Sequence, residues 1–248
     1  MQRFVTCGFV MLLAACAPAP TKPALPAGAA STAAADTGDA DVQRVVDGVH
    51  MIQSGQIQAA IDGPFNEVVH RYEAAYGAST KKIFSARGTA DALVYSTMGA
   101  SIKPPVATEV LGPAWAMAYW GRAYAYNEMA RYDDAIVELN KALALAPYDA
   151  QYNIELAFDY QQKRQWATSL ELYKTAAAFV DLTAAPGAVA NMTCKALRGQ
   201  GYSLTELHRY DEARAAYRAC LEKIPDEPKS LGELKYIDQM EAKGRAGA

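Results

Sequence analysis

Three short stretches recur in the second half of the chain: Arg-Tyr-Asp-Asp-Ala at residues 131–135, Gln-Trp-Ala-Thr-Ser at 165–169 and Arg-Tyr-Asp-Glu-Ala at 209–213. The aromatic residue moves by 34 positions between the first two stretches and by 44 between the last two, which is the same period plus an insertion. A fixed period of this length is typical of repeat proteins built from pairs of helices. One pair cannot bury its apolar face alone, so the sequence predicts several stacked pairs.

The alignment of these stretches extends in both directions, with small residues, aromatic residues and prolines at matching offsets. The matching residues are Tyr119, Ala123, Tyr126, Ala130, Tyr132, Ala135, Leu139, Ala142 and Pro147 in the first unit, Ala157, Tyr160, Trp166, Ser169, Tyr173 and Ala176 in the second, and Gly201, Tyr210, Ala213, Tyr217, Cys220 and Pro225 in the third. This pattern resembles the tetratricopeptide repeat over residues 116 to about 227. The resemblance implies an all-α solenoid of helix-turn-helix units, in which small residues lie at helix crossings and aromatic rings fill the spaces beside them.

The regions that flank the three repeats are also predicted to be helical. Residues 41–112 form a divergent helical region with a degenerate repeat, whose first helix starts at Asp41 and whose partner helix is interrupted at Gly63-Pro64. Residues 77–112 fit no complete repeat, although a helix is expected from about Ala90 to Ser101. Residues 113–228 contain the three repeats. Residues 229–248 are predicted to be a capping helix and tail, with these side chains facing inward: Leu231, Leu234 and Ile237.

The N-terminus has a short positive start followed by an apolar run that ends at Ala15, which is typical of a secretory signal and too short to span a bilayer. Leu13-Ala14-Ala15-Cys16 resembles the lipobox of bacterial lipoproteins. The resemblance implies that residues 1–15 are a lipoprotein signal peptide and that Cys16 is lipidated. The alternative is an ordinary cleaved signal with a chance cysteine.

The residue that follows Cys16 is Ala17, not the Asp that marks inner-membrane retention in the enterobacterial pattern. By resemblance, the expected location is the outer membrane, facing the periplasm. Residues 16–40 are predicted to be a disordered Ala/Pro tether, because the segment has no apolar periodicity and contains Pro18, Pro20, Pro23 and Pro26.

Composition and motifs argue against catalysis and against nucleic-acid binding. The chain carries 24 Lys and Arg against 27 Asp and Glu, a net charge of −3, whereas nucleic-acid binding needs clustered cations. His50, His70 and His208 are far apart and form no metal-ligand motif, so no metal and no cofactor is expected. No carboxylate pair has a distinctive context. The sequence therefore predicts a protein without enzymatic activity and without catalytic residues.

Cys194 and Cys220 are the two cysteines that remain after the signal and Cys16 are set aside. Cys194 opens the first helix of the third unit, and Cys220 lies near the end of its second helix. Antiparallel helices bring these two ends together, and the expected compartment permits disulfides. The sequence predicts a bridge between them, with a pair of small buried thiols as the alternative.

The concave groove is the predicted functional surface, because the first helices of tetratricopeptide units line it. Carried over by position, the resemblance implies these groove residues: Trp120, Tyr124 and Asn127 in the first unit, Ile154, Phe158 and Gln161 in the second, and Lys195, Arg198, Tyr202 and Thr205 in the third. Tyr124, Phe158 and Tyr202 occupy equivalent places and are expected to form an aromatic ladder that binds a peptide or partner helix. The alternative is that the rings pack between neighbouring helices.

These observations lead to the hypothesis of a lipid-anchored scaffold that binds a protein or peptide partner of the cell envelope. Two alternatives remain open. The first is an envelope enzyme, or an enzyme regulator, with its active part in residues 41–112. The second is a self-associating structural spacer. The sequence identifies neither the partner nor the oligomeric state.

Overall fold

The computed structural model describes residues 30–246, and side chains over 39–242. The predicted signal peptide, Cys16 and most of the predicted tether lie outside these residues. Within the described range, no helix combines the length and hydropathy that a membrane span requires.

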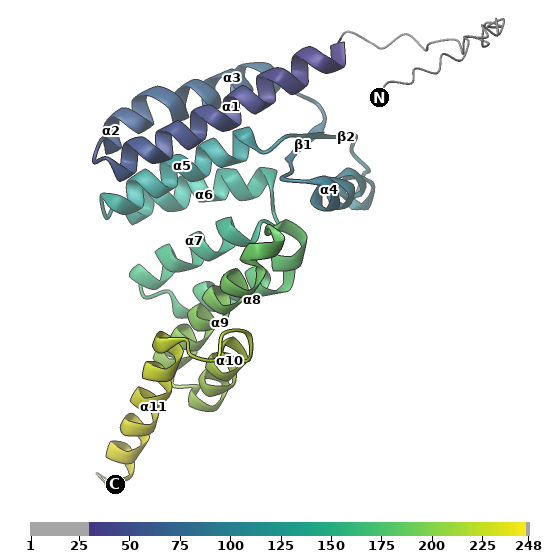
Figure 1. The fold of residues 1–248 in the computed structure, drawn as a ribbon. Coiled ribbons are helices and arrows are strands. Elements are labelled where there is room, and N and C mark those ends of the chain that lie inside the picture. Colours follow the sequence, from purple (N-terminus) through teal and green to yellow (C-terminus); the bar gives the residue numbers. More distant parts are fainter. Residues whose placement is uncertain (1–29, 247–248) are drawn as a thin grey trace, which may run out of the picture.

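Residues 114–223 form three antiparallel helix pairs that stack on one another (Figure 1). Each pair is joined by a short turn in which one residue adopts a positive φ, namely Ala130, Arg164 and His208. This repetition confirms the predicted all-α solenoid of helix-turn-helix units. The pairs are α5 (Ala114–Glu128) with α6 (Tyr132–Leu145), α7 (Ala150–Gln162) with α8 (Trp166–Thr183), and α9 (Val189–Glu206) with α10 (Tyr210–Lys223).

Small residues at the helix crossings accommodate the aromatic rings, as the repeat pattern predicts. A Cβ atom placed on Gly199 would lie 2.3 Å from the ring of Tyr173, and one on Gly201 would lie 2.6 Å from the ring of Tyr217. Both tyrosines are buried. The glycines therefore let α9 approach α8 on one side and α10 on the other.

The insertion between the second and third repeats lengthens the helices on either side of it. Helices α8 and α9 contain 18 residues each, compared with 14 in α6 and in α10. A single 3-10 turn, η2 (Pro186–Ala188), connects them. The insertion therefore changes helix length without disturbing the stacking order.

The N-terminal region forms a further hairpin that packs on α5. Its first helix, α1 (Ala30–Gln53), begins inside the predicted tether and not at Asp41, because the alanine-rich sequence favours helix. Its second arm is continuous through Gly63-Pro64, where the predicted interruption becomes a π-helical turn with Pro64 inside it. This arm consists of α2 (Ile57–Ala60), η1 (Ile61–Phe65) and α3 (Asn66–Tyr76).

Phe65 joins this hairpin to the repeats. Its ring is fully buried between Gly48 of α1 and Gly121 of α5, and a Cβ atom on either glycine would lie within 2.5 Å of the ring. Gly48 thus has the packing role that a divergent repeat requires.

Residues 77–112 contain two strands that the prediction of purely helical structure missed. Strand β1 (Lys82–Ser85) pairs in parallel with β2 (Thr108–Leu111), and α4 (Thr89–Ser101) connects them. The four-residue strands are too short to show a periodicity in the sequence.

This β-α-β insert packs against the loop between the first two repeats. The backbone nitrogen of Tyr148 donates a hydrogen bond to the hydroxyl of Tyr95, over 3.3 Å. Arg87 forms an ion pair with Asp149 and lies 4.9 Å from the ring of Tyr152. The insert therefore braces the junction of the first two repeats.

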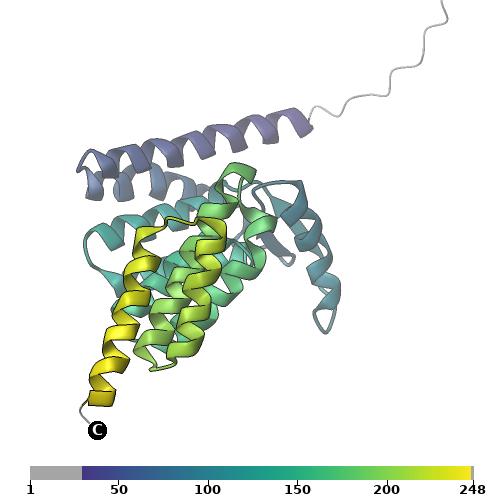
Figure 2. The same cartoon turned by 60° about the horizontal axis from the view of Figure 1, so that its bottom comes forward.

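The last helix, α11 (Pro228–Ala246), follows α10 and packs against α9 and α10 (Figures 1 and 2). Ile237 is fully buried and Leu234 packs beside it, as predicted. Leu231 is 40% exposed, so its predicted inward orientation is wrong. Arg214 of α10 attaches the polar face of α11 through ion pairs with Asp238 and Glu241.

Candidate functional site

Adjoining pockets form a groove along α7 and α9. The first, of about 290 Å³, is lined by residues that include Ile154, Glu155 and Lys195. The second, also about 290 Å³, shares Lys195 and continues past Phe158 and Tyr202 to α11. The third, about 440 Å³, lies at the Arg164 end and shares Phe158 and Tyr202. The shared residues make these pockets one continuous groove.

The predicted residues of the first unit do not line these three pockets. Trp120 and Tyr124 stack on each other, with ring centroids 5.9 Å apart and an interplanar angle of 5°. Asn127 is partly buried, and its Oδ1 atom has no hydrogen-bond partner among the described residues. The groove is therefore formed by the second and third repeats and α11.

The predicted residues of the second unit have three different environments. Phe158 is 39% exposed and faces the groove, whereas Ile154 is only 1% exposed and contributes to a pocket wall. The side chain of Gln161 donates hydrogen bonds to the Gly199 carbonyl and the Ser203 hydroxyl, both at a distance of 3.0 Å. Gln161 therefore ties α7 to α9 while lining the groove.

The predicted residues of the third unit fall into two groups, those that line the groove and one that is buried. Tyr202 is 41% exposed in the groove, and Lys195 and Arg198 line the same pocket. The prediction of Thr205 as a groove residue is wrong, because this residue is only 6% exposed. Its hydroxyl donates a hydrogen bond to the Gly201 carbonyl within α9, at a distance of 2.9 Å. A helix residue that points into the packed side of its own hairpin is not available to a ligand.

Tyr236, on α11, is an exposed aromatic residue near Tyr202 that the sequence interpretation missed, although it lines none of the three pockets. It lies 34 positions after Tyr202, which is one repeat period, and it is 46% exposed. Its hydroxyl is close enough to contribute to the raised pKa of Tyr202, after burial and two nearby carboxylates. Helix α11 therefore occupies the place of a fourth first helix. We call Phe158, Tyr202 and Tyr236 the aromatic ladder; the repeat period was the signal that could have found its last member.

Two further rings support the ladder from behind. Tyr132, at the start of α6, contacts Phe158 edge-on with centroids 6.4 Å apart. Trp166, at the start of α8, contacts Tyr202 in the same way at 5.9 Å. The same contact thus recurs in successive repeats, where Phe158 and Tyr202 each pack against a neighbouring ring and remain partly exposed.

The charged groups of the groove are mainly cations. Lys195 forms an ion pair with Glu155, and Arg198 forms one with Glu227, each with an N···O distance of 2.9 Å. Among the described residues, Arg164 and Lys229 line the groove without an ion pair. The groove can therefore offer hydrogen-bond donors to a ligand.

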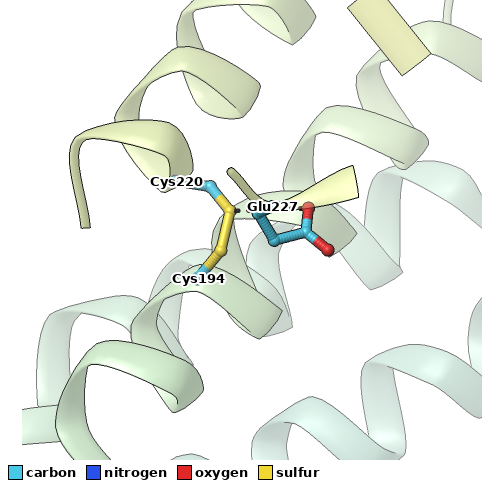
Figure 3. Close-up of side chains that lie close together, drawn as sticks. All are labelled: Cys194, Cys220 and Glu227. Carbon is cyan, nitrogen blue, oxygen red and sulfur yellow. Dashed lines mark hydrogen bonds between the residues drawn. A yellow bond between two sulfur atoms is a disulfide. The ribbon is translucent and has the colours of Figure 1, made fainter. Parts of the chain in front are cut away.

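Cys194 and Cys220 are joined by a disulfide in the structure, with Cα atoms 4.4 Å apart (Figure 3). Both are fully buried, and Glu227 lies beside them. The sulfurs and the carboxylate are within 4.8 Å of one another, but bonded sulfurs offer no thiolate to a metal. Glu227 instead accepts a hydrogen bond from the Ser230 backbone nitrogen, over 2.6 Å, and so caps α11.

The disulfide cluster therefore holds the end of the groove together. The bridge joins α9 to α10, while Glu227 connects the start of α11 to Arg198 of α9. The negative carboxylate at the N-terminus of α11 is also favourable to the helix dipole. The pKa of the Glu227 carboxyl group is lowered, because the hydrogen bonds from Ser230 and the charge of Arg198 outweigh the opposing effect of burial.

A comparison with protein families identifies one of the helix pairs described above. A family model described as the tetratricopeptide repeat matches residues 116–149, which are α5, α6 and the loop that follows. The fold and this match define the chain as an all-α protein that contains a tetratricopeptide repeat. A search of curated proteins found no match.

Two solved structures illustrate the similarity. The first tetratricopeptide domain of Spaghetti (RPAP3), bound to the HSP90 peptide SRMEEVD, is 23% identical, with a TM-score of 0.45; the match covers 51% of this chain and 93% of that one. The crystal structure of MamA is 13% identical, with a TM-score of 0.47, and the match covers 80% of this chain and 96% of that one.

Proposed function

We propose that the chain is a lipid-anchored scaffold that faces the periplasm and holds a segment of a protein in the groove formed by α7, α9 and α11. The observation that carries this proposal is the aromatic ladder, because its three rings are exposed on α7, α9 and α11, which pack in succession. Exposed aromatic residues in concave surfaces commonly anchor protein partners. Solenoids present extended concave surfaces of this kind.

The envelope location in this proposal rests on the sequence of the N-terminus. The apolar run ending at Leu13-Ala14-Ala15-Cys16 supports lipidation at Cys16, and Ala17 supports the outer membrane. In this role the lipid fixes the location, the following segment gives reach, and the groove binds the partner. No chemical step is required of any residue.

A photo-cross-linking amino acid at Tyr202 is expected to capture one discrete envelope protein in intact cells. The matched control is the same amino acid at Leu93, which is 70% exposed on α4, a helix that lines none of the three pockets. The products are compared on denaturing gels and identified by mass spectrometry. If the two positions yield the same products, or if Tyr202 yields none, the groove is not the binding surface.

The variant Cys16→Ser is expected to move the protein from the membrane fraction to the soluble periplasmic fraction. A thiol at this position is the attachment point of the lipid, and a serine hydroxyl does not replace it. Fractionation after osmotic release, followed by mass spectrometry of the N-terminal peptide, measures the change. A wild-type N-terminal peptide without added lipid mass would disprove the anchor.

A further inference from the structure

The rings of the aromatic ladder lie on three helices that pack in succession, with Phe158 on α7, Tyr202 on α9 and Tyr236 on α11. Helix α7 packs against α9, and α9 packs against α11. Packed helices lie about 8–10 Å apart, so successive rings are separated by about that distance. A ligand that used all three rings would need an apolar group at the same interval.

A polyproline II helix with proline at every third residue has this interval. It makes one turn in three residues and rises about 3.1 Å per residue, so such prolines lie on one face about 9 Å apart. The sequence of this chain contains one segment with this proline spacing, because Pro20, Pro23 and Pro26 are three residues apart. Aromatic-lined grooves are a recurring binding site for segments of this kind.

The polar groups of the groove also suit a proline-rich ligand. Proline lacks a backbone N–H group, so the segment mainly offers carbonyl acceptors. The groove supplies donors in Arg164, Lys229 and Gln162, which are exposed. Glu233 is the only acid among the described residues that line the second and third pockets, and the segment carries one cation, Lys22.

We propose that the aromatic ladder binds residues 17–28 of a second copy of this chain, with Pro20, Pro23 and Pro26 against the three rings. This inference rests on the proposed function and names the segment that the groove holds. The segment must come from another copy, because only three residues separate Pro26 from Ala30, where α1 begins. The start of α1 and the groove lie in different halves of the molecule (Figure 1).

This contact joins two different surfaces, so it is heterologous and can propagate from copy to copy. Anchoring all copies in one membrane raises their effective concentration and favours a weak contact of this type. The expected result is a head-to-tail array of scaffolds whose grooves are filled by neighbouring segments.

Complementation between two defective variants tests the proposal, with the full chain in mild detergent. The variant Pro20→Ala/Pro23→Ala/Pro26→Ala keeps the groove, and Tyr202→Ala/Tyr236→Ala keeps the segment. We expect each variant alone to be monomeric in sedimentation velocity, whereas their equimolar mixture forms a 1:1 heterodimer and the wild type self-associates. Each ring removed is expected to weaken association by about tenfold.

Controls separate this outcome from misfolding and from other contacts. Thermal unfolding followed by circular dichroism verifies that both variants fold. Leu93→Ala, on the exposed face of α4, should self-associate like the wild type. A monomeric wild type, a mixture that stays monomeric, or a ladder variant that associates alone overturns the proposal.

A peptide with the sequence of residues 17–28 provides a second measurement that needs no groove variant. It should dissociate the wild-type assembly, while the same peptide with alanine in place of Pro20, Pro23 and Pro26 should not. Equal effects of the two peptides overturn the proposal. If these tests fail while the cross-linker at Tyr202 captures a different envelope protein, this inference fails and the proposed function stands.

Discussion

Replacing Asp159 by Asn is expected to stabilise the folded chain by on the order of 2–4 kcal/mol at pH 8. Asp159 lies on α7 and is fully buried, and neither carboxylate oxygen has a hydrogen-bond partner among the described residues. Its pKa is raised to about 8, mainly by burial and to a smaller extent by Glu155, while the adjacent Asn127 opposes the shift. An asparagine removes the charge while keeping the shape of the side chain.

The direction of the pH dependence follows from this raised pKa. The folded chain binds the Asp159 proton up to about pH 8, whereas the unfolded chain releases it near pH 4. The proton bound to Asp159 therefore stabilises the folded chain fully below about pH 4. This contribution declines as the pH rises to about 8, and above that pH it causes no further change in stability. Asp159→Asn should remove this part of the decline.

Urea unfolding at intervals between pH 4 and pH 9 measures the difference between the two proteins. Asp133→Asn is the matched control, because the Asp133 side chain is 84% exposed in its ion pair with Lys163. The control should leave the pH profile almost unchanged. Parallel profiles for wild type and Asp159→Asn would show that the buried carboxyl group does not titrate as described.

Replacing Gly121 by Ala is expected to destabilise the fold by on the order of 2–4 kcal/mol, in spite of the better helix propensity of alanine. The new Cβ atom would lie 2.4 Å from Cε1 of Phe65. The ring cannot move away, because it is fully buried and Gly48 of α1 contacts the same ring edge. The substitution therefore separates the N-terminal hairpin from the first repeat.

Gly232→Ala on α11 is the control for this prediction, because a Cβ atom at Gly232 would have no neighbour within 4 Å. It should stabilise the protein by about 0.5–1 kcal/mol through helix propensity alone. Thermal unfolding of the three proteins measures both effects. A Gly121→Ala protein as stable as the wild type would mean that the Phe65 site can rearrange.

The sequence predicted the repeat hairpins well because their signals are local and periodic. The turns at Ala130, Arg164 and His208 recur at matching repeat positions. Each of these residues lies two positions before the aromatic residue that starts the next helix. The strand pair at 82–85 and 108–111 was missed, because it depends on pairing between segments that are distant along the chain.

The candidate site was predicted only in part. Repeat position identified Phe158 and Tyr202 as groove residues, since helix periodicity fixes the face on which a side chain lies. It did not identify the hydrogen bonds that engage Gln161, nor the burial of Ile154 and Thr205, because these depend on how closely neighbouring helices approach.

By itself, the sequence determined the period, the order of the helix pairs and the small residues that let them pack, because each is a property of short stretches. Only the tertiary structure decided that α11 lines the groove through Lys229 and Glu233, and that the predicted residues of the first unit lie outside its three pockets. The physical reason is that a groove is a relation between helices. Its lining depends on their relative positions, which no single repeat contains.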